Sequence, residues 1–316
     1  MTRAQRLAAL VFLTALCGTA GIATVAAEEP VFPVEPELFV DDPFQGCEGI
    51  AFNGEGRLFV TCNRGLWEVR TDGSVEELGQ LDSNLGVAGY GGRDLLVADF
   101  GPTNAFRHDR NDDGIVWHFS PDGTQRRAHA QGIGDPNFIL VLEDASYLVS
   151  DDATSDIYHV TPDGDVSLFT TAVNHPNGMV LSRDGQTLYV AQMFSNIRPV
   201  VGVNRLWALR LEDGKPFRDA KLVATTGPGS MPDGLAMDTA GRVYIAANRE
   251  RKIWRYDPAT DETVLIADGI PGAASLVFGE GDFDRSSLYV TSTFTNGEGG
   301  KIWRVPVGIE GATVTR

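Results

Sequence analysis

The stretch His175-Pro176-Asn177-Gly178-Met179-Val180 recurs in altered form at three other places in the chain. The other copies are Cys47-Glu48-Gly49-Ile50-Ala51, Asp135-Pro136-Asn137-Phe138-Ile139 and Met231-Pro232-Asp233-Gly234-Leu235-Ala236. Each copy places one oxygen-bearing side chain directly before a short apolar run that is typical of a β-strand. The recurrence indicates a protein built from repeats.

A second repeated signal is an aliphatic residue followed by an aromatic one. The six aromatic residues, which include all five tryptophans, are Trp67, Trp117, Tyr158, Trp207, Trp254 and Trp303. Neighbours in this series are 41 to 50 residues apart, which is the period of a propeller blade or a solenoid unit. A second strand pattern, such as Leu188-Tyr189-Val190-Ala191, precedes each pair.

These two signals predict an all-β fold, a six-bladed β-propeller with four strands in each blade. No long segment has the apolar 3.6-residue period of a helix, which argues against helical repeats. Too few residues follow Trp303 to form an outer strand, so we expect residues 31–40 to supply it and close the ring. Two separate β domains are the alternative, but no linker supports them, and residues 28–316 are predicted to form a single domain.

The N-terminus has the pattern of a secretory signal peptide. Arg3 and Arg6 precede an apolar run over residues 7–16, and small residues lead to Ala27. A membrane anchor is the alternative, but the apolar run is shorter than the ~20 residues that span a bilayer. We predict cleavage after Ala27 and a periplasmic or secreted protein.

The charge of the chain restricts its partners. The formal net charge is −17, and such an acidic surface repels nucleic acid and anionic lipid. No later run is long and apolar enough to insert into a membrane. We therefore expect a monomer that acts on a small-molecule substrate, with no nucleic-acid partner and no membrane insertion after signal cleavage.

Cys47 and Cys62 flank the turn Asn53-Gly54-Glu55-Gly56 symmetrically. Directly opposed residues of antiparallel strands have Cα atoms roughly 4.5–5.5 Å apart, within the range of a disulfide. An even number of cysteines after the signal peptide is typical of exported proteins with disulfides. We predict a Cys47–Cys62 bridge, with two free thiols as the alternative.

The oxygen-bearing residue of each copy stands at the start of a predicted inner strand, and inner strands line the channel of a propeller. Glu48, Asn137, Asn177 and Asp233 should therefore converge on the axis. Two carboxylates and two amides offer only oxygen donors, which calcium prefers, although another divalent cation is possible. The alternative is that these steps are only turns, but four copies in one register favour a metal site.

The ends of the predicted second strands should lie beside this ring. They place a substrate rim at four residues, Asp151, Gln192, Met193 and Asn248. Phe106, Phe138 and Phe194 would make the wall apolar and favour a less polar substrate. Separately, residues 109–114 fit the first half of a calcium loop, so a second, structural calcium competes there with a solvated acidic turn.

With these motifs the chain resembles the gluconolactonase and senescence marker protein (regucalcin-like) family of calcium-dependent six-bladed propeller hydrolases. The resemblance implies that Glu48, Asn137, Asn177 and Asp233 bind the catalytic metal and that Asp233 acts as base or nucleophile. Sugar-lactone members have an Arg-x-Asn-Asp-Gly pattern around the second ligand. Here that stretch is Asp135-Pro136-Asn137-Phe138-Ile139, without the arginine or the second aspartate.

We therefore predict an exported, calcium-dependent hydrolase of a lactone or ester, in which the metal polarises the carbonyl group. A serine hydrolase is disfavoured because the chain has no Gly-x-Ser-x-Gly elbow. Two alternatives remain. One is a phosphotriesterase-like hydrolase, and the other is a non-enzymatic propeller that binds a ligand or protein and holds calcium structurally.

Overall fold

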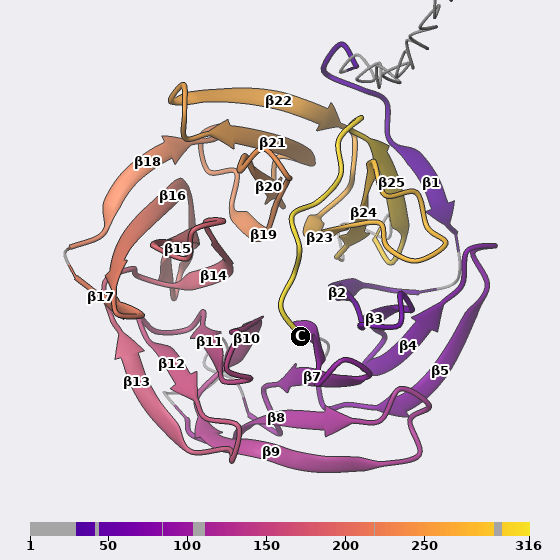
Figure 1. Cartoon of the computed structure of the whole chain (residues 1–316), viewed down its shortest axis with the longest axis vertical. Coiled ribbons are helices and arrows are strands. Elements are labelled where there is room, and N and C mark those ends of the chain that lie inside the picture. Colours follow the sequence, from indigo (N-terminus) through magenta and orange to yellow (C-terminus); the bar gives the residue numbers. More distant parts are fainter. Residues whose placement is uncertain (1–29, 42–43, 84, 104–110, 218, 294–298) are drawn as a thin grey trace, which may run out of the picture.

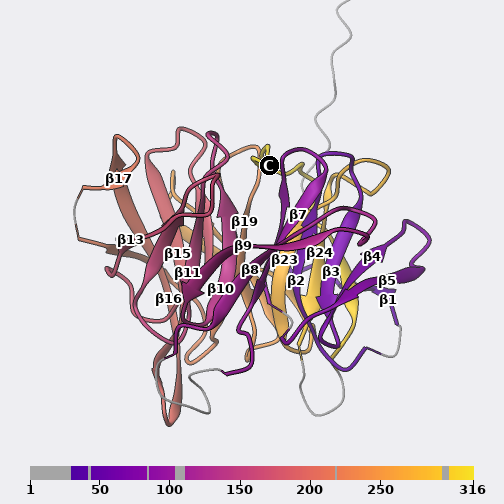
Figure 2. The ribbon, with the colours of Figure 1, turned by 90° about the horizontal axis from the view of Figure 1, so that it is seen from below.

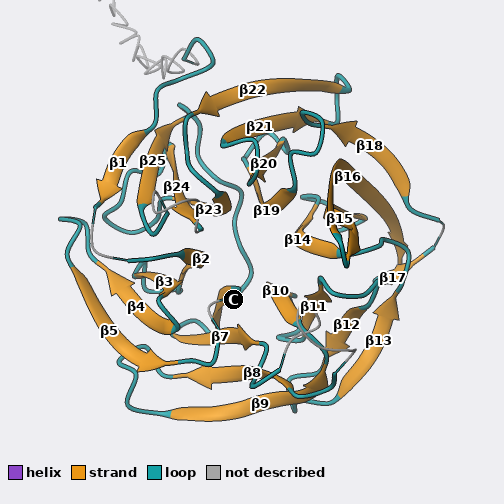
Figure 3. Ribbon diagram, turned by 180° about the vertical axis from the view of Figure 1, so that it is seen from behind, coloured by secondary structure: helices purple, strands orange, loops and turns teal. Residues whose placement is uncertain are grey.

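A computed structural model describes residues 30–316, apart from 42–43, 84, 104–110, 218 and 294–298. The predicted signal peptide, residues 1–27, lies outside the described residues. Strands and loops account for the whole described part, which contains no helix (Figure 3). Accordingly, no helix in this part has the length and apolarity that a bilayer crossing requires.

Six antiparallel sheets are arranged around a central axis, as the sequence predicts (Figure 1). Blade 1 consists of β2 (Cys47–Phe52), β3 (Leu58–Cys62), β4 (Gly65–Val69) and β5 (Val75–Gln80). Blade 2 consists of β6 (Val87–Tyr90), β7 (Asp94–Asp99), β8 (Gly114–Phe119) and β9 (Arg126–Ile133). Blade 3 consists of β10 (Pro136–Val141), β11 (Tyr147–Asp151), β12 (Ile157–Val160) and β13 (Val166–Thr170). Blade 4 consists of β14 (Pro176–Leu181), β15 (Thr187–Ile197), β16 (Val200–Glu212), β17 (Lys215–Pro216) and β18 (Lys221–Thr225). Blade 5 consists of β19 (Pro232–Met237), β20 (Val243–Ala247), β21 (Lys252–Asp257) and β22 (Glu262–Asp268). Blade 6 consists of β23 (Ala273–Phe278), β24 (Ser287–Ser292), β25 (Ile302–Pro306) and β1 (Glu37–Val40).

The N-terminal strand closes the ring. β1 pairs antiparallel with β25, with Leu38 opposite Trp303, so the last blade joins segments from both ends of the chain. This confirms the predicted origin of the outer strand, which is shorter than the predicted 31–40. Without β1, β25 would have an unpaired edge on the outside of the last blade.

The repeated aromatics lie in the third strand of each blade, as the period predicts. Several of their polar atoms hold that strand to the end of the second strand. The indole Nε1 of Trp207 donates to Gln192 Oε1 at 2.9 Å, and that of Trp254 donates to Glu250 Oε2 at 3.0 Å. Five of the six aromatics have a hydrogen-bond partner for their one polar group, whereas the buried Nε1 of Trp303 has none among the described residues.

Five of the six inner strands carry a bulge near their first residues. In β2 the pairing steps from Cys47–Cys62 to Ile50–Val60, so one extra residue is inserted on the inner strand. The same shift occurs in β10, β14, β19 and β23. A bulge re-aims the side chains at its centre. Blade 2, whose β6 pairs regularly with β7, lacks this device.

Glycines allow the inner strands to approach one another closely behind the bulges. A Cβ on Gly178 would lie 2.3 Å from the backbone oxygen of Asp233, and a Cβ on Gly49 would lie 2.3 Å from that of Leu85. No side chain fits at such distances. The glycine that follows the ligand in these copies is therefore required by the contact between neighbouring blades.

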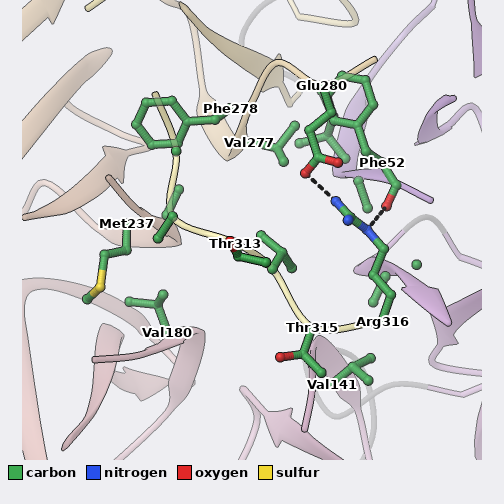
Figure 4. Close-up of a pocket in the computed structure, with 18 of the residues that line it drawn as sticks. Phe52, Val141, Val180, Met237, Val277, Phe278, Glu280, Thr313, Thr315 and Arg316 are labelled. Atoms are coloured by element: carbon green, nitrogen blue, oxygen red, sulfur yellow. Dashed lines mark hydrogen bonds and ion pairs between the residues drawn. The ribbon is translucent and has the colours of Figure 1, made fainter. Parts of the chain in front are cut away.

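The C-terminal segment lies across the other end of the channel, where the inner strands finish (Figure 2, Figure 4). Ala312 N donates to Met237 O at 2.9 Å, and Arg316 Nε donates to Phe52 O at 2.9 Å while its guanidinium pairs with Glu280. Beside this segment is a largely apolar cavity of about 450 Å³. The bulged starts of the inner strands face away from it.

The predicted disulfide is present, with Cys47 opposite Cys62 in the ladder and a Cα–Cα distance of 4.2 Å. It closes a loop with a sequence separation of 15 residues. We expect the double variant Cys47→Ser/Cys62→Ser to lose about 3 kcal/mol of unfolding free energy. Urea denaturation checks this, and reduction of the wild type should cause a similar loss. Equal stability of the variant and the oxidised wild type would contradict the expectation.

A buried ion pair supports blade 5. Asp238 is fully buried, and its Oδ2 accepts from Arg242 Nε at 2.7 Å and from the Tyr244 hydroxyl at 3.2 Å. We expect Asp238→Ala to lower the unfolding free energy by about 3–5 kcal/mol, because the arginine stays buried without its carboxylate. Urea denaturation measures the loss. The control, Arg285→Ala, removes an exposed pair with Glu310 and should cost less than about 1 kcal/mol; equal losses would refute the assignment.

Candidate metal centre

Four predicted ligands occupy one structural position in four blades. Glu48, Asn137, Asn177 and Asp233 are each the second residue of an inner strand and lie within its bulge. Asn177 and Asp233 are almost completely buried. In blade 6 the same position falls on Ala274, which has no donor atom.

Two of these positions follow an unusual backbone turn. His175 and Met231 have φ angles of 47° and 58°, in the left-handed region that residues with side chains rarely adopt. Neighbouring segments hold both turns, because His175 N donates to Thr154 O at 2.7 Å and Met231 N donates to Val203 O at 2.8 Å. Backbone strain of this kind is often concentrated at functional sites.

The two amides are fixed by residues from the second strands. Asn137 Nδ2 donates to Asp152 Oδ2 at 3.0 Å, and Asn177 Nδ2 contacts Met193 Sδ at 3.3 Å. With their NH₂ groups used in this way, the amide oxygens remain available. Asn177 Oδ1 is buried and accepts no hydrogen bond from the described residues, which is costly unless another group meets it. A cation at the axis would satisfy this oxygen.

Burial and neighbouring charges raise the pKa values of the two carboxylates of the ring. Burial raises the pKa of Glu48 well above its usual value, and the charges of Asp233 and Asp152 raise it further. Burial raises the pKa of Asp233 to about 7, against the opposing effect of its hydrogen bond with Asn248. Buried like charges of this kind are stabilised by a bound cation. The site therefore fits a hard divalent ion.

The geometry does not identify the ion. Within the described ranges no three His, Cys, Asp or Glu side chains are grouped so that they could hold a metal. The ring instead combines carboxylates with amides, a set of oxygen donors that suits calcium. The second calcium proposed for residues 109–114 stays a hypothesis, since Asp109 and Arg110 lie outside the described residues.

Of the predicted rim, Asn248 and Met193 contact the ring directly. Asn248 Nδ2 donates to Asp233 Oδ2 at 2.9 Å and to Thr293 Oγ1 at 3.2 Å, while Met193 contacts Asn177. Gln192 is buried, with its amide shared between Trp207 and the Phe194 backbone. The substrate contacts of all four rim residues remain predictions.

Asp151 and Asp152 face different surroundings. Asp151 is buried, accepts from Ala153 N at 3.1 Å and lies near the charge of Asp135. Asp152 also interacts electrostatically with Asp135, but it bonds to Asn137 and lies within the electrostatic reach of Glu48 and Asp233. The predicted rim contains Asp151, whereas Asp152 is the residue that contacts the ring. The strand register, with Pro136 opposite Asp151, is the signal that separates them.

The predicted apolar wall is only partly in place. Phe138 packs into the core cluster that contains Leu148 and Met179. Phe194 is buried and meets the His175 ring edge-on, with centroids 6.3 Å apart. Phe106 lies outside the described residues.

Comparisons with known proteins find a matching family region and a similar curated protein. Residues 144–294 match the family model described as the SMP-30/Gluconolactonase/LRE-like region. This region contains Asn177 and Asp233, whereas Glu48 and Asn137 lie before it. The pentonolactonase XacC of Haloferax volcanii is 30% identical over 152 residues, which are 48% of this chain and 49% of the relative. The chain thus matches about half the length of this curated relative.

Solved structures extend the likeness to the whole propeller. Regucalcin of Agrobacterium tumefaciens, a calcium-binding protein, has a TM-score of 0.71 at 19% identity, over 90% of this chain and 97% of its own. A gluconolactonase from Xanthomonas campestris has a TM-score of 0.65 at 20% identity, over 89% and 98%. These identities show a shared fold. Together with the family model, they confirm the resemblance: residues 144–294 form an SMP-30/gluconolactonase/LRE-like region within a six-bladed propeller.

Proposed function

We propose that the chain is an exported, calcium-dependent hydrolase that opens a small lactone or ester. The observation that supports the proposal is the equivalent position of Glu48, Asn137, Asn177 and Asp233 at the bulged starts of four inner strands. In addition, the buried Asn177 Oδ1 has no hydrogen-bond partner among the described residues. The pentonolactonase relative and the gluconolactonase-like region support a lactone as substrate.

The four ring residues would hold the ion. When bound, a divalent cation polarises the substrate carbonyl and stabilises the negative charge that develops on its oxygen. Asp233 takes the proton of the attacking water or attacks the carbonyl carbon itself. Asn248, which donates to Asp233 Oδ2 at 2.9 Å, orients the carboxylate so that its other oxygen faces the reaction.

The surroundings of the ring favour a less polar substrate than a sugar lactone. Position 135 is an aspartate, where sugar-lactone members of the resembled family have arginine, and the aspartate that follows their ligand is replaced by Phe138. Met193 adds an apolar group beside Asn177. Since the C-terminal segment lies across the other mouth of the channel, we assign substrate entry to the face with the bulges.

Two features support export. Residues 1–27 have the sequence pattern of a signal peptide, and the Cys47–Cys62 disulfide is typical of oxidising compartments.

The proposal is tested by hydrolysis of a substrate panel by the purified protein in the presence of calcium. The panel contains an alkyl-substituted lactone, a pentonolactone, an aryl ester and a phosphotriester, with acid release followed by pH-stat. We expect turnover of a lactone or ester, with the alkyl-substituted lactone preferred over the pentonolactone. Turnover confined to the phosphotriester would favour the phosphotriesterase-like alternative. No turnover on any substrate, with calcium still bound, would favour a binding propeller.

A further inference from the structure

The residue that fixes Asn137 is a carboxylate, whereas the corresponding residues of the other four bulged blades are uncharged. From the strand register, Asp152 corresponds to Asn63, Met193, Asn248 and Thr293. Met193 and Asn248 each contact the ring residue of their own blade. Orientation of a ring residue at this position therefore does not require a negative charge.

Only one oxygen of Asp152 is used for orientation. Oδ2 accepts from Asn137 Nδ2 at 3.0 Å, while Oδ1 is buried and has no hydrogen-bond partner among the described residues. Asp152 is 4% exposed, so water does not readily compensate for the missing partner. A buried carboxylate oxygen in this state is costly unless it meets a cation.

Asp152 lies close to carboxylates of its own blade and of other blades. It follows the second strand of blade 3 and interacts electrostatically with Asp151 and Asp135, and also with Glu48 of blade 1 and Asp233 of blade 5. Blades 1 and 5 lie on opposite sides of blade 3 (Figure 1). The hydrogen bond with Asn137 therefore holds the Asp152 carboxylate beside the ring.

We propose that Asp152, through its hydrogen bond to Asn137, adds a third negative charge beside the cation site, so that the site with its immediate surroundings carries −3 instead of −2. The inference rests on the proposed function, because it concerns the same ion. A site with this charge has an excess of −1 over a divalent ion and matches a trivalent one. It should therefore hold calcium more tightly than the four-residue ring alone, and should favour lanthanides over calcium.

The test uses calcium-depleted full-length mature protein as wild type, Asp152→Asn and Asp151→Asn. Calcium binding is measured by titration calorimetry and Tb³⁺ binding by sensitised luminescence. The amide of Asp152→Asn still accepts from Asn137, so only the charge is lost. We expect Asp152→Asn to weaken calcium binding about tenfold or more and Tb³⁺ binding by a larger factor. Asp151→Asn, which removes a buried carboxylate on the side of Asp135, should change both much less.

A melting curve of each metal-free protein supplies a readout that does not depend on the ion. If Asp152 adds repulsion to Glu48 and Asp233, Asp152→Asn should melt above the wild type without metal and gain less on calcium addition. If Asp152 had a purely structural role, Asp152→Asn would melt below the wild type both with and without calcium, and this result would overturn the inference. Unchanged calcium affinity in Asp152→Asn, or an equal loss of affinity in Asp151→Asn, would overturn it as well. If the wild type binds neither ion, the metal site itself is refuted.

Discussion

Asp233→Asn is expected to lower lactone turnover about a hundred- to ten-thousandfold, the range over which a positioned acid or base acts. Asp233 is buried at a bulge of β19, and Asn248 holds its carboxylate. The asparagine retains the shape and one oxygen donor but neither takes a proton nor attacks the substrate. Initial rates at saturating calcium measure the loss in chemistry separately from any loss in metal affinity.

The control for this variant is Asp122→Asn, which makes the same change in an exposed turn. It should leave the rate unaltered. If Asp233→Asn folds, binds calcium and hydrolyses the lactone like the wild type, then Asp233 is not the catalytic group.

Removal of calcium is expected to abolish turnover and to destabilise the fold. Without a cation, the like charges of the buried Asp152 and Asp233 and of the partly buried Glu48 repel one another. At calcium concentrations 100 times the Kd, binding contributes about 2.7 kcal/mol, which corresponds to several degrees in Tm for a domain of this size. Activity and melting curves in chelator, and again after calcium is restored, provide the measurement. Magnesium serves as the control ion because it demands a tighter geometry.

The stabilisation of the fold by calcium should increase with pH. In the metal-free fold the pKa of Asp233 is raised to about 7 from 3.8, and that of Glu48 is also raised. A raised carboxyl pKa contributes stability that is fully present below the unfolded value and is lost as pH rises through the folded value. Calcium needs the deprotonated groups. The Tm gap between the calcium-loaded and chelated protein should therefore widen from pH 5 to pH 8, and a constant gap would contradict the site.

The sequence predicted the propeller because its signals repeat with the blade. Trp207 and its equivalents mark third strands, and the Asn and Asp residues before the inner strands mark the axis. The period of these signals and their position within each repeat can be read from the sequence without information on the contacts between blades. For the same reason the Cys47–Cys62 bridge was predictable from symmetry about a single hairpin turn.

Features that depend on contacts between distant segments could not be predicted. The left-handed turns at His175 and Met231 oppose the usual preference of a residue before proline for extended backbone, and hydrogen bonds from other parts of the chain stabilise them. The bulge in β10 inserts a residue beside Asn137, and the sequence alone does not show that Asn137 then bonds to Asp152 and not to Asp151. The C-terminal segment reaches the channel through backbone and guanidinium bonds, which have no periodic pattern.

The central claim is that oxygen donors at the bulges hold a calcium ion that lactone hydrolysis requires. The most direct measurement is the initial rate of lactone hydrolysis by calcium-depleted protein as calcium is titrated back, for the wild type and for Asn177→Ala. We predict a rate near zero without calcium, saturation at one ion per chain for the wild type, and a weaker calcium response in the variant, which lacks the buried amide oxygen. Full turnover by calcium-depleted wild type, or an identical calcium response in both proteins, would contradict the account.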